Sequence, residues 1–202
     1  MTSKALASAQ TILGHSEIAS LIEEMAEAIV GRLRADESGP RQIEPTSLAL
    51  VGIHTGGAHL AERLADTLEG LLGKRPDVGA LDITLYRDDV LLAGHPAPVV
   101  RGTDVPFDVA KRYVVLVDDV LFTGRTVRAS LDALLDLGRP SCVRLAVLID
   151  RGLRELPVAA DVVGRLYETT LAQRLEVELT ESGAQSDAVV CIDPAAKPGE
   201  TS

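Results

Sequence analysis

Residues 113–137, YVVLVDDVLFTGRTVRASLDALLDL, constrain the fold of this 202-residue chain more than any other stretch. They open with the branched apolar run 114–117, which is typical of a strand buried on both faces. Two carboxylates, Asp118 and Asp119, follow at the point where such a strand leaves the sheet. After a short loop, apolar residues recur at helical spacing, namely Val127, Leu131, Leu134 and Leu135. The pattern predicts a buried strand, a loop and a helix.

The loop between this strand and this helix has the composition of a phosphate site. Its residues, Thr123-Gly124-Arg125-Thr126, combine two hydroxyl groups with a glycine, and we call them the phosphate loop. Backbone N–H groups at a helix N-terminus bind anions readily. We therefore expect a phosphate here, with Asp118 and Asp119 close enough to bind sugar hydroxyl groups. Paired acids after a buried strand also occur in metal-dependent phosphotransfer folds and as helix caps, so these alternatives stay open.

Strand and helix patterns alternate along the rest of the chain. An apolar helical face runs from an N-cap at Ser16 to about residue 34. A buried strand at 48–51 ends at Gly52-Ile53, and the turn His54-Thr55-Gly56-Gly57 leads into a helical stripe of Leu60, Leu64, Leu68 and Leu71. Further strands are expected at 80–86, 142–149, 161–163, 175–179 and 188–192. The order predicts an α/β fold with a mainly parallel central sheet flanked by helices, which binds ligands beyond the carboxyl ends of its strands.

Length and composition predict a single domain over residues 1–202. About 15 residues at the N-terminus are expected to be flexible, and a polar tail is expected from about residue 193. The stretch of about 87–111 is rich in glycine and proline, and we interpret it as a flap (a hood) over the carboxyl ends of the strands.

Composition also limits the compartment and the partners. The formal net charge of −10 argues against a broad basic face for nucleic acid. No apolar run reaches the ~18 residues of a membrane span, and no signal peptide is recognisable. Cys142 and Cys191 have no metal-ligand companions and are interpreted as reduced thiols of a cytoplasmic protein. His54 and His59 are lone histidines and are not assigned a catalytic role.

The strand, acid pair and T-G-R-T loop resemble the phosphoribosyl-diphosphate (PRPP) signature of type I phosphoribosyltransferases. Three further phrases resemble the bifunctional pyrimidine-operon regulator/uracil phosphoribosyltransferase family (PyrR): DITLYRDD from Asp82, DALLDLGRPS from Asp132 and LAVLIDRGLRELP from Leu145. The resemblance implies a type I phosphoribosyltransferase fold and the reaction of uracil with PRPP to give UMP and diphosphate. It also implies Mg²⁺ carried by PRPP, without a direct protein ligand, and a homodimer or higher homo-oligomer.

The resemblance assigns site residues one by one. Asp118 and Asp119 are the expected catalytic residues, and Asp119 is expected to lie closest to the charge that develops on the sugar. Arg87 could instead pair with Asp88 or Asp89 on the surface, and Arg151 could instead cap a helix or pair with Asp150. The expected substrate-binding set consists of Thr55 and Gly56 at diphosphate, Arg87 over the phosphates, Asp118, Asp119, Val120, Leu121, Phe122, Thr123, Gly124, Arg125 and Thr126 at PRPP, and Arg151 and Leu175 near the base.

Two departures from the family pattern affect function. Several relatives have T-R-G where this chain has Thr55-Gly56-Gly57, so a bidentate grip on diphosphate is missing and weaker catalysis is expected. RNA-binding relatives carry a basic residue within the stretch that is Leu156-Pro-Val-Ala-Ala here. RNA is therefore a possible but doubted partner, for which Arg32, Arg34, Arg139, Arg144 and Arg154 are the candidate cations.

Three other functions compete with the uracil enzyme. An RNA-binding attenuator of pyrimidine genes would use the nucleotide site only as a sensor, and it requires a basic RNA-contacting surface. A receiver or phosphatase domain would need further acids and a lysine at neighbouring strand ends, and it leaves the phosphate loop without a role. A P-loop nucleotidase is disfavoured because the glycine-lysine-serine/threonine ending is absent.

Overall fold

The computed structural model describes residues 8–38, 47–86 and 102–194. Its centre is a five-stranded sheet in the order β3-β2-β4-β5-β6, in which every neighbouring pair is parallel. The strands are β2 (Leu48–Ile53), β3 (Asp77–Leu81), β4 (Tyr113–Leu121), β5 (Cys142–Asp150) and β6 (Val162–Leu166). The expected α/β fold with a parallel central sheet is confirmed.

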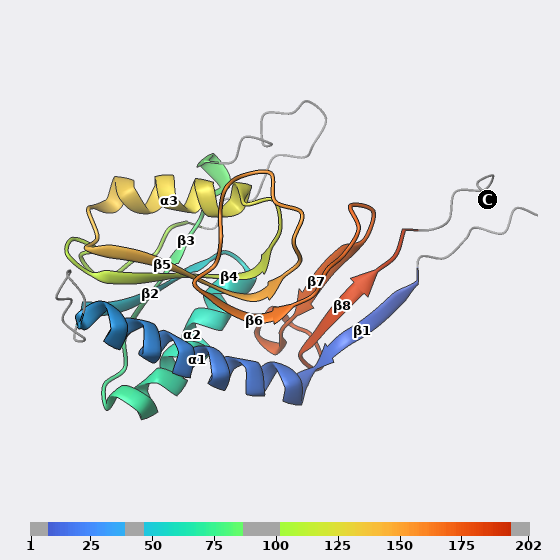
Figure 1. Ribbon diagram of the computed structural model, residues 1–202, viewed down its shortest axis with the longest axis horizontal. Coiled ribbons are helices and arrows are strands. Elements are labelled where there is room, and N and C mark those ends of the chain that lie inside the picture. Colours follow the sequence, from blue (N-terminus) through green and yellow to red (C-terminus); the bar gives the residue numbers. More distant parts are fainter. Residues whose placement is uncertain (1–7, 39–46, 87–101, 195–202) are drawn as a thin grey trace, which may run out of the picture.

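Helices cover both faces of this sheet (Figure 1). α1 (His15–Glu37) and α2 (Gly56–Leu72) lie on one face, and α3 (Arg125–Leu137) lies on the other. The apolar stripes predicted from the sequence face the core in α1 and α2, except that Leu71 is 44% exposed. In α3, Val127 and Leu134 are buried but Leu135 is 55% exposed, so part of that predicted stripe faces outward. None of these helices has the length and apolar character of a membrane span.

The start of α1 differs from the sequence prediction. The helix begins at His15, and the N-cap is Gly14 rather than Ser16. The Gly14 N–H donates to Oε2 of Glu17 at 2.9 Å, so the acidic residue expected in the first turn satisfies the backbone there. A cap from Ser16 is therefore not used.

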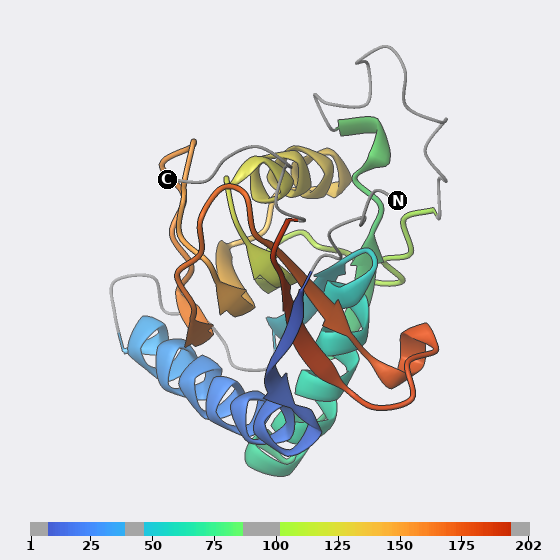
Figure 2. The ribbon, with the colours of Figure 1, turned by 90° about the vertical axis from the view of Figure 1, so that its right-hand side faces the viewer.

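A second, antiparallel sheet lies beyond the carboxyl ends of the parallel strands (Figures 1 and 2). It consists of β1 (Ala9–Gly14), β8 (Ala188–Ile192) and β7 (Arg174–Glu178), in the order β1-β8-β7. We call it the hood sheet, and it is a different part of the chain from the flap expected at about 87–111. The sequence analysis placed no strand before Ser16 and expected a flexible segment there. Instead, Ala9 pairs with Ile192 at the opposite end of the chain.

The strand predicted at 80–86 lies earlier in the chain, because β3 runs over Asp77–Leu81. β3 stops at Leu81, and Thr84–Tyr86 form a 3₁₀ turn. Asp82 causes this ending, because its side chain accepts hydrogen bonds from the backbone N–H of Thr84 (2.8 Å) and Gly102 (3.1 Å). Side-chain acceptance of this kind competes with strand pairing.

The expected flap is described only in part. Residues 87–101, with Arg87, lie outside the described residues. Residues 102–111 pack on the sheet edge: Asp104 and Ala80 exchange two backbone hydrogen bonds of 2.7 and 2.8 Å, and Val109 is 1% exposed. The interpretation of the stretch of about 87–111 as a flap over the carboxyl ends of the strands remains a prediction.

Candidate active site

The acid pair of Asp118 and Asp119 lies inside β4 rather than after it. Pairing between β2 and β4 ends at Gly52 and Val117, whereas β4 continues to pair with β5 as far as Leu121 and Asp150. The acid pair therefore occupies a part of β4 that has lost its neighbour on the β2 side. Asp118 is only 6% exposed.

The loop from β2 to α2 fills the space that β2 leaves, and glycines make this possible. A Cβ added to Gly56 would lie 2.1 Å from Oδ2 of Asp119, and one added to Gly57 would lie 2.2 Å from the carbonyl oxygen of Val117. Thr55 is the exposed N-cap of α2, and the peptide bond before it is cis. The structure thus places Gly56 against Asp119, with Thr55 next to it in the chain. The binding of diphosphate by Thr55 and Gly56 remains a prediction.

Burial shapes the electrostatics of the acid pair. Desolvation and the neighbouring charge of Asp119 raise the pKa of Asp118 well above its usual value, against the hydrogen bond it accepts from the Asp119 N–H (3.1 Å). Burial also raises the pKa of Asp119, which accepts a hydrogen bond of 2.7 Å from the Val120 N–H. Neither carboxylate forms an ion pair with a described residue. The pair is therefore suited to bind hydroxyl donors or a ligand that brings a cation.

The phosphate loop leads directly into α3. Gly124, the N-cap, has a φ of 92°, and a Cβ at this position would lie 3.3 Å from the side chain of Val158. Only glycine adopts this left-handed conformation without strain. α3 begins at Arg125, so its first backbone N–H groups lie within the loop, as the sequence predicts. A helix start of this kind is suited to bind an anion.

The segment between β5 and β6 packs against the phosphate loop. The carbonyl oxygen of Thr123 accepts from the N–H groups of Glu155 (3.0 Å) and Leu156 (3.1 Å). Arg125 forms an exposed ion pair with Glu155 at 2.7 Å. Arg154 binds several backbone carbonyls of this region, including that of Phe122 at 2.8 Å. The sequence analysis considered Arg154 only as a surface cation, because which carbonyls it meets depends on the path of the loop.

Arg151 joins Phe122, which directly precedes the phosphate loop, to the segment that leads into β7. Its guanidinium carbon lies 4.1 Å from the centre of the Phe122 ring. Nε donates to Oγ1 of Thr169 (2.8 Å), and Nη2 donates to the carbonyls of Thr170 (3.0 Å) and Gln173 (2.8 Å). Burial lowers the pKa of Arg151. The alternative ion pair with Asp150 is wrong, because Asp150 pairs with Arg154.

Leu175 lies on β7 of the hood sheet, which approaches β4. It is 9% exposed, pairs across the strands with Cys191 and packs in the main core. No contact in the described structure separates a base-binding role from plain core packing for this side chain. Its assignment to the base remains a prediction.

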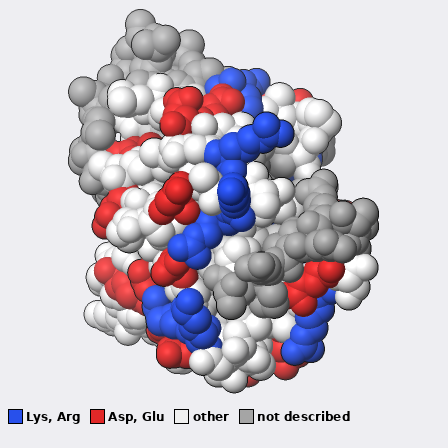
Figure 3. Space-filling view, turned by 90° about the vertical axis from the view of Figure 1, so that its left-hand side faces the viewer, with Lys and Arg blue, Asp and Glu red and all other residues white. Residues whose placement is uncertain are grey.

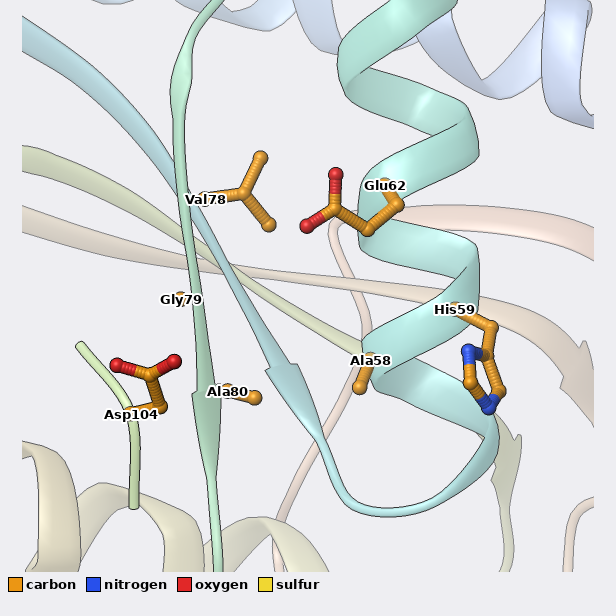
Figure 4. A pocket seen from close by; sticks show the side chains of 7 residues that line it. All are labelled: Ala58, His59, Glu62, Val78, Gly79, Ala80 and Asp104. Atoms are coloured by element: carbon orange, nitrogen blue, oxygen red, sulfur yellow. The ribbon is translucent and has the colours of Figure 1, made fainter. Parts of the chain in front are cut away.

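A groove of about 230 Å³ lies between α2 and β3, apart from the acid pair. Glu62 and Val78 face each other across it, and the ring of His59 lies on the side of α2 that is away from β3 (Figure 4). Glu62 is already paired with Arg75 at 2.6 Å.

Within the described ranges, no three His, Cys, Asp or Glu residues come together as metal ligands. A receiver-type cluster of acids is therefore not found there.

Three of the five arginines considered for RNA, namely Arg32, Arg144 and Arg154, have carboxylate partners. Arg144 pairs with Asp36 (2.6 Å) and Asp161 (3.0 Å), and Arg32 lies 3.9 Å from Asp161. The face that carries the amino ends of the parallel strands shows a line of Lys and Arg with acidic residues beside it (Figure 3). Cations neutralised in this way contribute little to phosphate binding.

Comparison with known proteins agrees with this geometry. The phosphoribosyl transferase domain family matches residues 8–170. Proteins called "Bifunctional protein PyrR" from Bacillus mycoides (strain KBAB4) and Bacillus cereus (strain B4264) are each 56% identical over 137 residues, which cover 67% of this chain and 76% of theirs.

Solved structures with the same fold are phosphoribosyltransferases of low sequence identity. The hypoxanthine phosphoribosyltransferase of Trypanosoma cruzi superposes with a TM-score of 0.64 at 16% identity, over 92% of this chain and 97% of that one. A hypoxanthine-guanine phosphoribosyltransferase of Bacillus anthracis gives a TM-score of 0.56 at 16% identity, over 78% and 83%. At this identity they show the fold alone, and the type I phosphoribosyltransferase fold expected from the sequence is confirmed.

Proposed function

This chain belongs to the PyrR family of phosphoribosyltransferases, and on that premise we propose that it makes UMP and diphosphate from uracil and PRPP. The observation that carries the proposal is the acid pair at the open end of β4, followed at once by the N-terminus of α3. A phosphorylated ribose needs an anion site and hydroxyl acceptors about one sugar apart. The phosphate loop and the two carboxylates supply both.

The site residues have distinct proposed roles. The phosphate loop binds the 5′-phosphate, and Asp118 and Asp119 accept hydrogen bonds from the 2′- and 3′-hydroxyl groups. Gly56 stands against Asp119, so the backbone of the β2–α2 loop faces the diphosphate that is attached to the same ribose. Arg151 and Leu175 are proposed to lie near the base, and Arg87 near the phosphates.

In the proposed reaction, the bond between C1′ and the diphosphate oxygen breaks with its electron pair leaving on diphosphate. The bond between C1′ and N1 of uracil forms, and the N1 proton is released. Positive charge develops on the ribose as diphosphate departs, and the carboxylate of Asp119 stabilises it. The family resemblance implies that the protein contributes positioning and electrostatics rather than covalent catalysis.

Mg²⁺ fits this site as a companion of PRPP. Mg²⁺ is commonly bound through one or two carboxylates together with substrate phosphates, and the acid pair offers two carboxylates. The described residues bring no third ligand to them. Asp118 and Asp119 would hold the ion through the ribose hydroxyl groups of PRPP, and the ion would supply charge neutralisation for the departing diphosphate.

A purely regulatory role that depends on RNA lacks a supporting observation here. Such a protein needs several cations aimed at phosphates, and the net charge is −10. Arg144 and Arg154, two of the candidate cations, are engaged by carboxylates. We therefore place catalysis first.

A steady-state assay tests the proposal. The protein is incubated with PRPP, Mg²⁺ and one base at a time, namely uracil, cytosine, hypoxanthine or guanine, and the nucleotide product is measured. We expect UMP from uracil and no comparable product from the purines. Turnover of a purine but not uracil would contradict the proposed substrate and keep the reaction type, whereas no turnover of any base would contradict the enzymatic function.

A further inference from the structure

One guanidinium binds the backbone around the phosphate loop although it belongs to no residue expected to touch PRPP. Nη1 of Arg154 donates to the carbonyls of Phe122 (2.8 Å) and Gly152 (2.9 Å), and Nε donates to that of Val158 (3.1 Å). We propose that Arg154 is a positioning residue, which orients the peptide groups of the phosphate loop toward the phosphate of PRPP. The inference rests on the proposed function, because it concerns the same site.

The planarity of the peptide group is the physical basis. In a trans peptide the carbonyl and the following N–H point in opposite directions. Arg154 holds the carbonyl of Phe122, so the N–H of Thr123 points away from Arg154. The carbonyl of Thr123 is held by the N–H groups of Glu155 and Leu156, so the N–H of Gly124 also points away from that segment. Both N–H groups thus point away from the segment between β5 and β6, which leaves them available to an anion bound at the start of α3.

The guanidinium itself is anchored to the sheet. Arg154 forms an ion pair with Asp150, the last residue of β5, and both side chains are mostly buried. Asp150 also accepts a hydrogen bond of 2.9 Å from the N–H of Gly152. The arginine therefore transmits the rigid position of β5 to the carbonyl of Phe122. A lysine cannot replace it fully, because a single ammonium group lacks the planar fork that reaches several acceptors at once.

Arg144 offers a matched control at the other end of β5. It is also a partly buried arginine with carboxylate partners, Asp36 and Asp161, which lie outside the phosphate loop. Removing its guanidinium should lower stability without changing the loop. Comparison of the two arginines separates a positioning role from a general loss of stability.

The experiment measures PRPP binding by isothermal titration in the presence of Mg²⁺, together with the melting temperature of each variant. We expect Arg154→Met to raise the Kd for PRPP about tenfold or more, because small misplacements at such sites are costly. Arg154→Lys should raise it by less. Arg144→Met should lower the melting temperature and leave the Kd within about twofold of the wild type, since distant sites act independently.

Each outcome supports or overturns the inference. An unchanged Kd in folded Arg154→Met overturns it and leaves the proposed function standing. An equal loss of affinity in Arg144→Met also overturns it, since instability would then be the cause. If Arg154→Met does not fold, wild-type affinity in Arg154→Lys overturns the inference. Wild-type protein that binds PRPP but does not use uracil contradicts the proposed substrate alone, and wild-type protein that does not bind PRPP contradicts both.

Discussion

Two arguments predict opposite effects on activity when Gly56 is replaced by arginine. Relatives with arginine there suggest that Gly56→Arg would add a grip on diphosphate and raise activity. The structure predicts the reverse, because a Cβ at Gly56 would lie 2.1 Å from Oδ2 of Asp119. Atoms in contact need about 3.5 Å, so the loop or the carboxylate must move by more than ~1 Å.

The size of the expected loss follows from that displacement. A shift of ~1 Å in a positioned group can cost about 10²-fold in rate, which corresponds to about 2.7 kcal/mol of transition-state stabilisation. We therefore expect Gly56→Ala, which changes only the space, to lower kcat/KM for PRPP about 10²-fold. Gly56→Arg should also fall below the wild type.

A control in the same helix distinguishes this effect from glycine replacement in general. Gly70 in α2 has nothing within 4 Å of an added Cβ. Gly70→Ala should raise the melting temperature, because alanine favours a helix by about 1 kcal/mol over glycine, and should leave kcat/KM unchanged. Wild-type kcat/KM in Gly56→Ala, or an increase in Gly56→Arg, would refute the argument from space.

Four further predictions concern charges and hydroxyl groups. Asp119→Asn should lower kcat/KM at least ~10²-fold with an unchanged circular dichroism spectrum, since a positioned charge is lost. Burial raises the pKa of Asp118, so its ionised form destabilises the fold. Asp118→Asn should therefore increase the free energy of unfolding by about 0.5–2 kcal/mol at pH 7. This gain should shrink when thermal unfolding is measured at lower pH, where the wild-type carboxyl group is protonated. Arg63 lowers the pKa of Glu181 from 4.5 to about 2, so the stability that this pair contributes above pH 4.5 is lost as the pH falls toward 2. Arg63→Met should therefore make the melting temperature depend less on pH in this range. Thr126→Val should weaken UMP binding by roughly 1–3 kcal/mol in isothermal titration; unchanged affinity would place the phosphate elsewhere.

The parts of the fold that were predictable are those with a strong local pattern. The apolar run 114–117 and the following acids identified β4, the phosphate loop and the start of α3. β1 could not be predicted, because its six residues carry little alternation and their partner β8 lies at the other end of the chain. The early end of β3 depends on which groups Asp82 meets in three dimensions.

The candidate site was predictable to a similar degree. The acid pair was found from its place after the apolar run 114–117, and Gly56 through the family resemblance; the structure places Gly56 against Asp119. The role of Arg154 was missed because its acceptors are backbone carbonyls, which carry no sequence signal. The cation–ring contact between Arg151 and Phe122 was missed for a similar reason, since 29 positions separate the two residues.

The most direct test of the central claim is a crystal structure of the protein with UMP bound. We expect the 5′-phosphate to accept hydrogen bonds from the backbone N–H groups and hydroxyls of Thr123-Gly124-Arg125-Thr126. We expect the 2′- and 3′-hydroxyl groups to donate to Asp118 and Asp119. A nucleotide whose phosphate lies away from the N-terminus of α3, or whose ribose does not touch the acid pair, would contradict the account.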